Sequence, residues 1–269
     1  MFNLIACAVS KHEGRYLNDW LQWHKRLGVE KFVLYDEGGE HLTHQVLQKY
    51  CWDGLVDFIP APQHPVQYQA YSNCINRYVG KSDWVLFLDI DEFICPTGLQ
   101  NLDLRAWLNK FNHHNIGAVG MAWSCFGSNE KDVYEPIPVW ERIVHRVDYE
   151  ETAKHHTRHI KSFVRPQCVR SVFDPHLFSL KTGFITVDPK FRPLHTSEWK
   201  SWEFPMDEVF VAHYSTKTRE EWALKFARGS ADSGPDAHNA RKMEMFEAHI
   251  KACTRVDHSM QLMAKRLGL

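Results

Sequence analysis

Two aspartates, separated by one residue, are the strongest chemical signal in this chain. In WVLFLDIDEF, Asp89 and Asp91 end a run of apolar residues, and period-two alternation places them on one face of a strand. Two neighbouring anions require a cation. Carboxylate oxygens suit Mn²⁺ or Mg²⁺, ions that proteins hold with one or two carboxylates plus substrate phosphate oxygens. The pattern therefore predicts a metal cofactor and a phosphate-bearing ligand.

The same tripeptide also fits other structures and functions. It could be an acidic turn in which Asp91 or Glu92 caps a following element. Phosphatases with an aspartyl nucleophile carry Asp-x-Asp after a buried strand, but near the N-terminus and followed by Thr or Val, whereas Glu92 and Phe93 follow here. A metal-dependent phosphohydrolase and a noncatalytic nucleotide-sugar or glycan-binding module thus remain as alternatives to a transferase.

The elements that must position the aspartates alternate between strand and helix. Residues 3–9 predict a strand, and apolar residues from Leu17 to Leu27 recur at helical spacing before Gly28. Further strands are predicted at 31–36, 55–59 and 84–90, with helices within 43–50 and 66–79. The alternation predicts an α/β fold with a mostly parallel central sheet and flanking helices. Ligands of such sheets bind beyond the carboxyl ends of the strands.

The second half of the chain shows a weaker alternation. We expect a helix near 102–111 and strands near 117–123, 137–147, 159–165, 168–173 and 208–214. Thr218 and Glu221 form a capping-box pattern that opens a helix ending at Arg228, and 229–239 is the predicted linker to a helical tail. The predicted division is a nucleotide-sugar-binding half (1–98), an acceptor-binding half of the same domain (99–229) and a C-terminal helical extension (230–269).

Composition excludes some classes of partner. The 269 residues carry a formal net charge of −1, which gives no bias toward nucleic acid. The apolar start is interrupted at Lys11, His12 and Glu13, too early for a signal peptide or a transmembrane segment. Seven dispersed cysteines predict reduced thiols. We therefore expect a cytoplasmic protein, and peripheral contact with a membrane stays open.

Several blocks of residues occur in a recognisable order. They are SKHEGRYLNDWLQWHKRLGVEKFVLYDEGG, DWVLFLDIDEFI, WSCFGSNE, VWERIV, KSFVRP and HYSTKTREEWALKFARG. Over roughly residues 3–229, the chain resembles bacterial GT-A glycosyltransferases related to glycosyltransferase families 2 and 92. It departs from the family pattern at His12 and Glu37, where the family has Asn, so that a donor contact by these two positions is in doubt.

The resemblance implies a GT-A fold and transfer of a hexose from a nucleotide-diphosphate donor, most often a UDP-hexose. The acceptor would be a hydroxyl of a glycan or glycolipid, with inversion at the anomeric carbon. By similarity, Lys11, Glu13 and Asp36 would line the nucleoside pocket, with Asp36 accepting the uracil imide N–H. Asp36 could instead be an ordinary turn residue before Gly38.

Other site residues also follow from the resemblance. Lys161 and Arg165 would touch the diphosphate, unless they are solvated strand charges. The closing block would add positive charge through Lys217, Lys225 and Arg228. In the WSCFGSNE block, the residues that would line the acceptor site are Trp123, Phe126, Gly127 and Ser128, although core packing is the alternative for the two aromatic residues.

Two further roles complete the predicted site. His213, at the end of the predicted strand 208–214, would be the third ligand of the metal beside Asp89 and Asp91, and the alternative is a core-edge histidine bonded to backbone. Glu141 would be the base that takes the acceptor proton, and Asp91 would act through the metal. The alternative for Glu141 is a charge on a strand surface.

Overall fold

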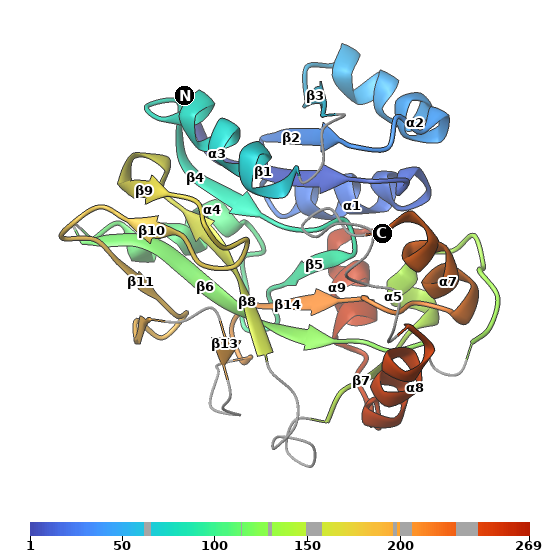
Figure 1. Cartoon of the computed structure of the whole chain (residues 1–269). Coiled ribbons are helices and arrows are strands. Elements are labelled where there is room, and N and C mark those ends of the chain that lie inside the picture. The colour runs from blue at the N-terminus through green and yellow to red at the C-terminus, as the bar shows by residue number, and fades with distance from the viewer. Residues whose placement is uncertain are drawn as a thin grey trace.

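A mixed central sheet runs through the computed structural model, which describes residues 1–61, 66–113, 115–128, 131–148, 158–195, 198–199, 206–229 and 242–269. The strand order is β12-β11-β6-β8-β4-β1-β2-β3, with β13, β14 and β5 pairing off this path (Figure 1). Helices flank the sheet, as Figure 1 shows. The predicted α/β fold, a central sheet with flanking helices, is confirmed.

The first half follows the predicted alternation. Its elements are β1 (Phe2–Ser10), α1 (Gly14–Arg26), β2 (Lys31–Asp36), α2 (His41–Trp52), β3 (Val56–Pro60), α3 (Gln67–Tyr78), β4 (Ser82–Phe87) and β5 (Glu92–Cys95). Strand β1 pairs in parallel with β2 and β4, and β2 pairs in parallel with β3. The carboxyl ends of these four strands therefore meet at one edge.

The second half adds strands of both directions. Its elements are α4 (Leu104–Leu108), η1 (Asn109–Phe111), β6 (Ile116–Cys125), α5 (Val139–Arg142), β7 (His145–Arg146), β8 (Arg158–Val164), η2 (Pro166–Cys168), β9 (Val169–Ser171), β10 (Ser179–Leu180), β11 (Ile185–Val187), β12 (Pro193–Leu194), β13 (Glu198–Trp199), β14 (Phe210–His213), α7 (Arg219–Arg228), α8 (Lys242–Ala252), β15 (Arg255–Val256) and α9 (Ser259–Leu267). Strand β8 lies antiparallel between β4 and β6, and β14 joins β6 to β5.

One predicted strand is wrong. Residues 137–147 form the short helix α5 and the two-residue strand β7. Pro138 directly precedes α5, and its fixed φ suits a helix start, while the N–H of Glu141 donates to the Pro138 carbonyl at 3.0 Å. Helical hydrogen bonding therefore overrides the β-branched composition of this segment.

The two faces of the sheet bury separate clusters. On β1, Leu4, Ala6 and Ala8 lie in the cluster that includes Trp20, Leu21 and Trp23 of α1. The alternate residues Ile5, Cys7 and Val9 lie in the cluster that includes Tyr71, Cys74 and Ile75 of α3. This period-two division is why α1 and α3 cover opposite faces.

The C-terminal elements pack on the body of the domain. Helix α9 lies against α5, α1 and β5, and β15 pairs with β7. The helical tail is confirmed for the described residues 242–269, whereas residues 230–239 of the predicted linker lie outside the described residues. None of the seven cysteines forms a disulfide. Within the described ranges we find no helix with the length and apolarity needed to cross a bilayer.

Candidate active site

Asp89 and Asp91 lie in a turn between β4 and β5, not on a strand face as the alternation predicts. Strand β4 ends at Phe87, and the N–H of Leu88 donates to the Cys7 carbonyl at 3.2 Å. The chain then turns, because the N–H of Glu92 donates to the Asp89 carbonyl at 3.1 Å and the Glu92 carboxylate accepts the Asp89 N–H at 2.8 Å. Both aspartates still reach the predicted edge of the sheet.

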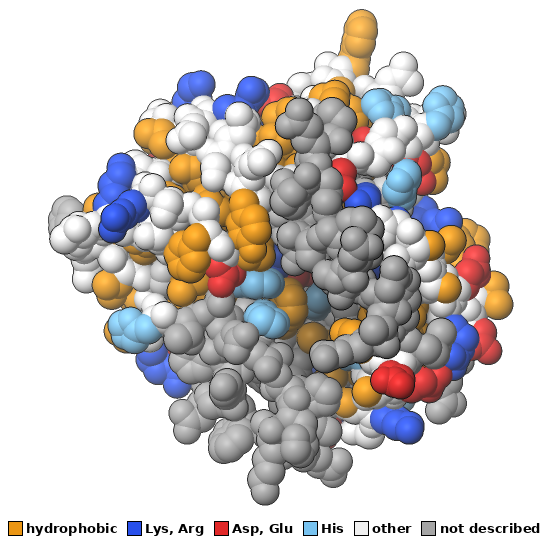
Figure 2. Space-filling view, in the orientation of Figure 1, with side chains coloured by type: hydrophobic (Ala, Val, Ile, Leu, Met, Phe, Trp, Pro, Cys, Tyr) orange, Lys and Arg blue, Asp and Glu red, His pale blue; other side chains and the backbone are white. Residues whose placement is uncertain are grey.

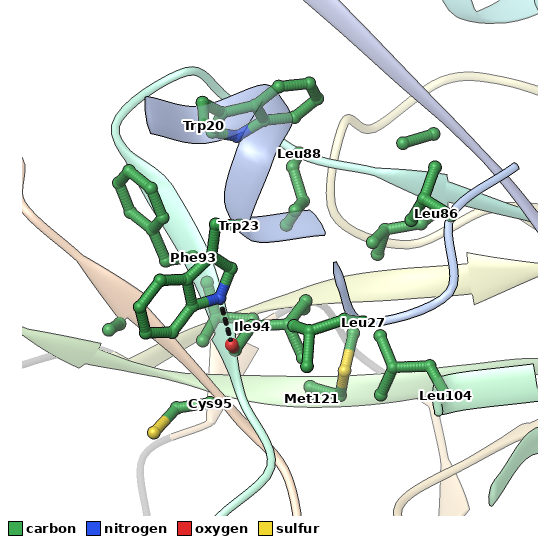
Figure 3. Packing of buried hydrophobic residues seen from close by; sticks show 14 of the residues in the cluster. Trp20, Trp23, Leu27, Leu86, Leu88, Phe93, Ile94, Cys95, Leu104 and Met121 are labelled. Atoms are coloured by element: carbon green, nitrogen blue, oxygen red, sulfur yellow. Dashed lines mark hydrogen bonds between the residues drawn. The ribbon is translucent and has the colours of Figure 1, made fainter. Parts of the chain in front are cut away.

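Helix α1 fixes the strand that follows this turn. The indole N–H of Trp20 donates to the Glu92 carbonyl at 3.0 Å. The indole N–H of Trp23 donates to the Ile94 carbonyl at 2.8 Å, the bond drawn in Figure 3. The N–H of Ile94 donates to Nε2 of His24 at 3.3 Å. Three side chains at helical spacing thus bind the backbone of β5 and hold the turn against α1.

Both oxygens of Asp89 have protein partners. Its Oδ1 accepts from Nε2 of Gln67 at 3.0 Å, and its Oδ2 accepts from Nζ of Lys161 at 2.8 Å. Burial alone would lower the pKa of Lys161, but Asp89 and Glu92 raise it well above its usual value. Burial raises the pKa of Glu92 well above its usual value, although Lys161 opposes the shift. Lys161 therefore lies beside Asp89, and its contact with the diphosphate stays a prediction.

Asp91 uses its two oxygens differently. Its Oδ2 accepts from Nζ of Lys225 at 2.6 Å and lies 3.5 Å from Nζ of Lys217. Its Oδ1 lies 3.5 Å from Nε2 of His213. Burial would raise the pKa of Asp91, but Lys225, Lys217 and His213 lower it well below the usual value. The carboxylate is thus ionised, and one oxygen faces an imidazole rather than an ammonium.

His213 ends β14 at a position paired with Glu92 of β5. Its ring lies 4.2 Å from that of Trp123, which also contacts the rings of His159 and His176. Histidine side chains also gather beside an acidic one near the middle of the face in Figure 2. Burial lowers the pKa of His213, so its imidazole is neutral at pH 7 and can act as a ligand.

The donor atoms of Asp91 and His213 fit a divalent cation. At metal–ligand distances of about 2.1 Å, two donors 3.5 Å apart can share one ion. Nδ1 of His213 is buried without a hydrogen-bond partner in the described chain. Asp89 does not complete a triad: its oxygens bind Gln67 and Lys161, and no group of three or more His, Cys, Asp or Glu converges within the described residues.

The predicted nucleoside side lies at the ends of β1 and β2. Asp36 pairs with Ser10 in the sheet, and its Oδ2 accepts the Gly39 N–H at 2.8 Å. Its Oδ1 is buried without a hydrogen-bond partner in the part of the chain that the structure describes, and burial raises the pKa of Asp36. Lys11 pairs with Glu37 at 2.6 Å. The unused oxygen of Asp36 can therefore accept from a ligand.

Arg228 joins this nucleoside side to α7. It donates to Glu13 at 2.8 Å and also to the Lys11 carbonyl. Lys225, on the same helix, reaches Asp91. Two cationic side chains on one face of α7 therefore bind both the loop after β1 and the turn after β4, which are distant in sequence.

Two predicted site residues lie apart from this cluster. Sheet pairing puts Val164 opposite Val85, and the guanidinium of Arg165 stacks over Trp84 at 5.5 Å, at the opposite end of β4 from Asp89. Arg165 is therefore not brought together with the aspartates. The side chain of Glu141 is exposed on α5, on a helix rather than a strand, and its role as the base stays a prediction.

Sequence reasoning missed Gln67 and Glu92 as partners of the aspartates. Glu92 directly follows Asp91, and an acidic residue at that point is a signal that could have been used. Gln67 begins α3 without any local pattern that predicts its contact with Asp89. That contact depends on how α3 packs on the sheet.

Comparison with known proteins identifies a family and related proteins. A family model described as glycosyltransferase family 92 matches residues 10–246. A family 92 protein of Ricinus communis is 26% identical over 250 residues, covering 86% of this chain and 41% of that protein. One of Oryza sativa subsp. japonica is 25% identical over 249 residues, covering 87% and 39%. The chain therefore spans about two fifths of the length of these relatives.

Among solved structures, S. aureus TarS 1–349 matches with a TM-score of 0.41 at 12% identity, covering 94% of this chain and 73% of that chain. The two family 92 relatives are plant proteins, so the expected resemblance to bacterial members of the family is not supported. The family match includes the turn after β4, His213 and all of α7. This chain belongs to glycosyltransferase family 92.

Proposed function

We propose that the chain transfers a hexose from a nucleotide-diphosphate donor, a UDP-hexose, to a hydroxyl of a glycan or glycolipid in the cytoplasm, with inversion. The observation that carries the proposal is the Asp91 carboxylate, which faces two lysines with one oxygen and a neutral His213 with the other. This group lies where the parallel strands of a family 92 chain end. Such edges hold ligands in open α/β sheets.

The nucleoside end of the donor would lie beside Asp36. The partnerless Oδ1 of Asp36 can accept the imide N–H of uracil, while its Oδ2 stays bound to Gly39. Cytosine lacks a hydrogen at the equivalent ring nitrogen, so this contact favours uridine over cytidine. Lys11 and Glu13 would border the same pocket from the loop after β1.

The diphosphate would lie between Asp91 and α7. Lys225 touches Asp91 and keeps one third of its side chain exposed, so its ammonium can also meet a phosphate oxygen. Lys217 is buried beside it, and two ammonium groups against one carboxylate leave a positive excess. Charge that develops on the β-phosphate as the sugar leaves is then stabilised most in the transition state.

Mn²⁺ or Mg²⁺ would be held by Asp91 and His213. A bound ion of this kind supplies positive charge to the departing nucleoside diphosphate. The protein residues orient it: β14 carries His213 and the turn after β4 carries Asp91, and the register of β14 with β5 sets their separation. Asp89, held by Gln67 and Lys161, shapes the turn rather than closing a three-residue ligand set.

Product analysis tests this function. The chain is incubated with UDP-hexoses, glycan acceptors and Mn²⁺, and UDP, UMP and hexose 1-phosphate are measured separately. We expect acceptor-dependent release of UDP without UMP, reduced at least about 100-fold by Asp91→Asn and unchanged in the exposed control Asp53→Asn. Release of UMP and hexose 1-phosphate would indicate a phosphohydrolase. Binding of UDP-hexoses without any turnover would indicate a noncatalytic module.

A further inference from the structure

Glu221 joins three elements behind the proposed donor site. Its carboxylate accepts from both terminal nitrogens of Arg142 on α5, each at 2.7 Å, and from the hydroxyl of Tyr16 on α1 at 2.8 Å. The side chains of Glu221 and Arg142 are each 1% exposed. The Thr218 N–H donates to the same carboxylate at 3.0 Å, which completes the predicted capping box. One buried carboxylate therefore connects α1, α5 and the first turn of α7.

The face of α7 that Glu221 anchors also carries the cations of the site. Lys225 and Arg228 follow Glu221 by four and seven residues, so all three project from one side of the helix. Lys225 reaches Asp91 at 2.6 Å, and Arg228 reaches Glu13 at 2.8 Å. A shift of the first turn of α7 would therefore move both cations away from the two loops.

The segment entering α7 is held in an unfavourable conformation. Lys217 has a φ of 52°, which lies in the left-handed region that non-glycine residues rarely adopt. Its Nζ lies over the ring of Tyr16 at 4.6 Å and near Asp91. The capping box begins at the next residue, Thr218, so Glu221 constrains the backbone where Lys217 turns toward the site.

A buried ion pair is a poor way to stabilise a fold. Desolvation of the two charges offsets most of their attraction, and well-packed apolar residues often serve as well or better. Burial would raise the pKa of Glu221, but the hydrogen bonds and charge of Arg142 lower it to about 2, so the pair is ionised at neutral pH. The bidentate pair fixes both the distance and the orientation between the guanidinium and the carboxylate, which apolar packing does not do.

We propose that Glu221 is a positioning residue, which holds α7 so that Lys225 meets the diphosphate of the donor. The contact with the donor rests on the proposed function. The Glu221 carboxylate is buried and is bound by Arg142, Tyr16 and the Thr218 N–H. Its effect on the donor must therefore pass through the position of Lys225.

A double-mutant cycle between Glu221 and Lys225 tests the proposal. Glu221→Gln keeps the size of the side chain and removes its charge, and Lys225→Met removes the ammonium. The exposed Glu220→Gln, one residue away, is the matched control. UDP affinity in Mn²⁺ is measured by calorimetry, and amide hydrogen exchange is measured across α7. Tyr16→Phe is a milder variant that removes one hydrogen bond to Glu221 and keeps the ring beneath Lys217.

We expect Glu221→Gln and Lys225→Met each to weaken UDP binding about tenfold, and the double variant to be no weaker than the worse single variant. Hydrogen exchange in 219–228 should quicken at least about tenfold in Glu221→Gln, less in Tyr16→Phe, and not in Glu220→Gln. If Glu221→Gln fails to fold, Tyr16→Phe takes its place in both measurements.

Other results would overturn the proposal. Effects of Glu221→Gln and Lys225→Met that multiply would show that Glu221 does not act through this lysine. Unchanged exchange in α7 would show that Glu221 does not hold the helix. If the wild-type protein binds no UDP at all, the proposed function fails, whereas the exchange measurement still decides whether Glu221 positions α7.

Discussion

Replacing His24 with glutamine tests how α1 holds the strand after the aspartates. The imidazole is fully buried, with Nδ1 2.8 Å from the Trp20 carbonyl and Nε2 accepting the Ile94 N–H at 3.3 Å. Since a carbonyl only accepts, Nδ1 carries the hydrogen and Nε2 must stay unprotonated. Burial lowers the pKa of His24 from 6.5 to about 3, although the bond to Trp20 opposes the shift.

The sign of the effect follows from proton binding. Because the pKa of His24 is lower in the folded state, the unfolded chain binds a proton first as the pH falls, and stability declines between about pH 6.5 and about pH 3. The total decline from this residue is about 5 kcal/mol, since each unit of pKa shift corresponds to about 1.4 kcal/mol. Between about pH 7 and about pH 5, His24 accounts for a loss of about 2 kcal/mol in the free energy of unfolding.

Urea unfolding at these two pH values is the assay. Wild type should lose about 2 kcal/mol more on acidification than His24→Gln, while the exposed control His41→Gln should lose as much as wild type. Other buried groups, including His176, titrate equally in all three proteins and cancel in the comparison. If wild type and His24→Gln lose equal stability between these pH values, His24 is not a neutral buried acceptor for Ile94.

Three more substitutions probe the site. Asp36→Ala should weaken UDP by about 1–3 kcal/mol and CDP by less, measured by calorimetry, and an equal loss for both would remove uracil recognition. His213→Ala should raise the Mn²⁺ concentration for half-maximal UDP release, whereas unchanged metal dependence with a lower melting temperature would mark a structural residue. Lys161→Met should lower the free energy of unfolding by about 3–5 kcal/mol in urea, because Asp89 loses a buried partner; a change within about 0.5 kcal/mol would contradict this.

Local patterns predicted the elements that carry the site. Period-two and helical spacing gave the first β-α alternation, and Thr218 with Glu221 formed the capping box that the sequence predicts. These features depend on residues close in sequence, which set backbone conformation directly.

The path of the chain through the aspartates could not be predicted in the same way. Leu88 and Ile90 continue the apolar alternation of the preceding strand, yet β4 stops at Phe87. The turn is set by the bond of Leu88 to Cys7 on β1 and by Glu92 folding back on Asp89. Composition does not distinguish a continuing strand from an apolar turn buried against α1.

The partners of the site depend on tertiary pairing. Lys161 reaches Asp89 because β8 inserts antiparallel between β4 and β6, an arrangement that a β-α alternation does not predict. The same register carries Arg165 to the far end of β4. Resemblance to a family placed both residues near the diphosphate, and only the pairing of strands separates them.

Titration of the wild-type protein with UDP, with Mn²⁺ and again with excess chelator, tests the central claim most directly. Asp91 and His213 fit a shared cation, and without it the diphosphate would meet the Asp91 and Asp89 carboxylates with less positive charge to offset them. We expect calorimetry to find UDP binding in Mn²⁺ and at least about tenfold weaker binding in chelator. Equal affinity under both conditions, or no binding of UDP in Mn²⁺, would contradict a metal-dependent nucleotide-sugar site at this turn.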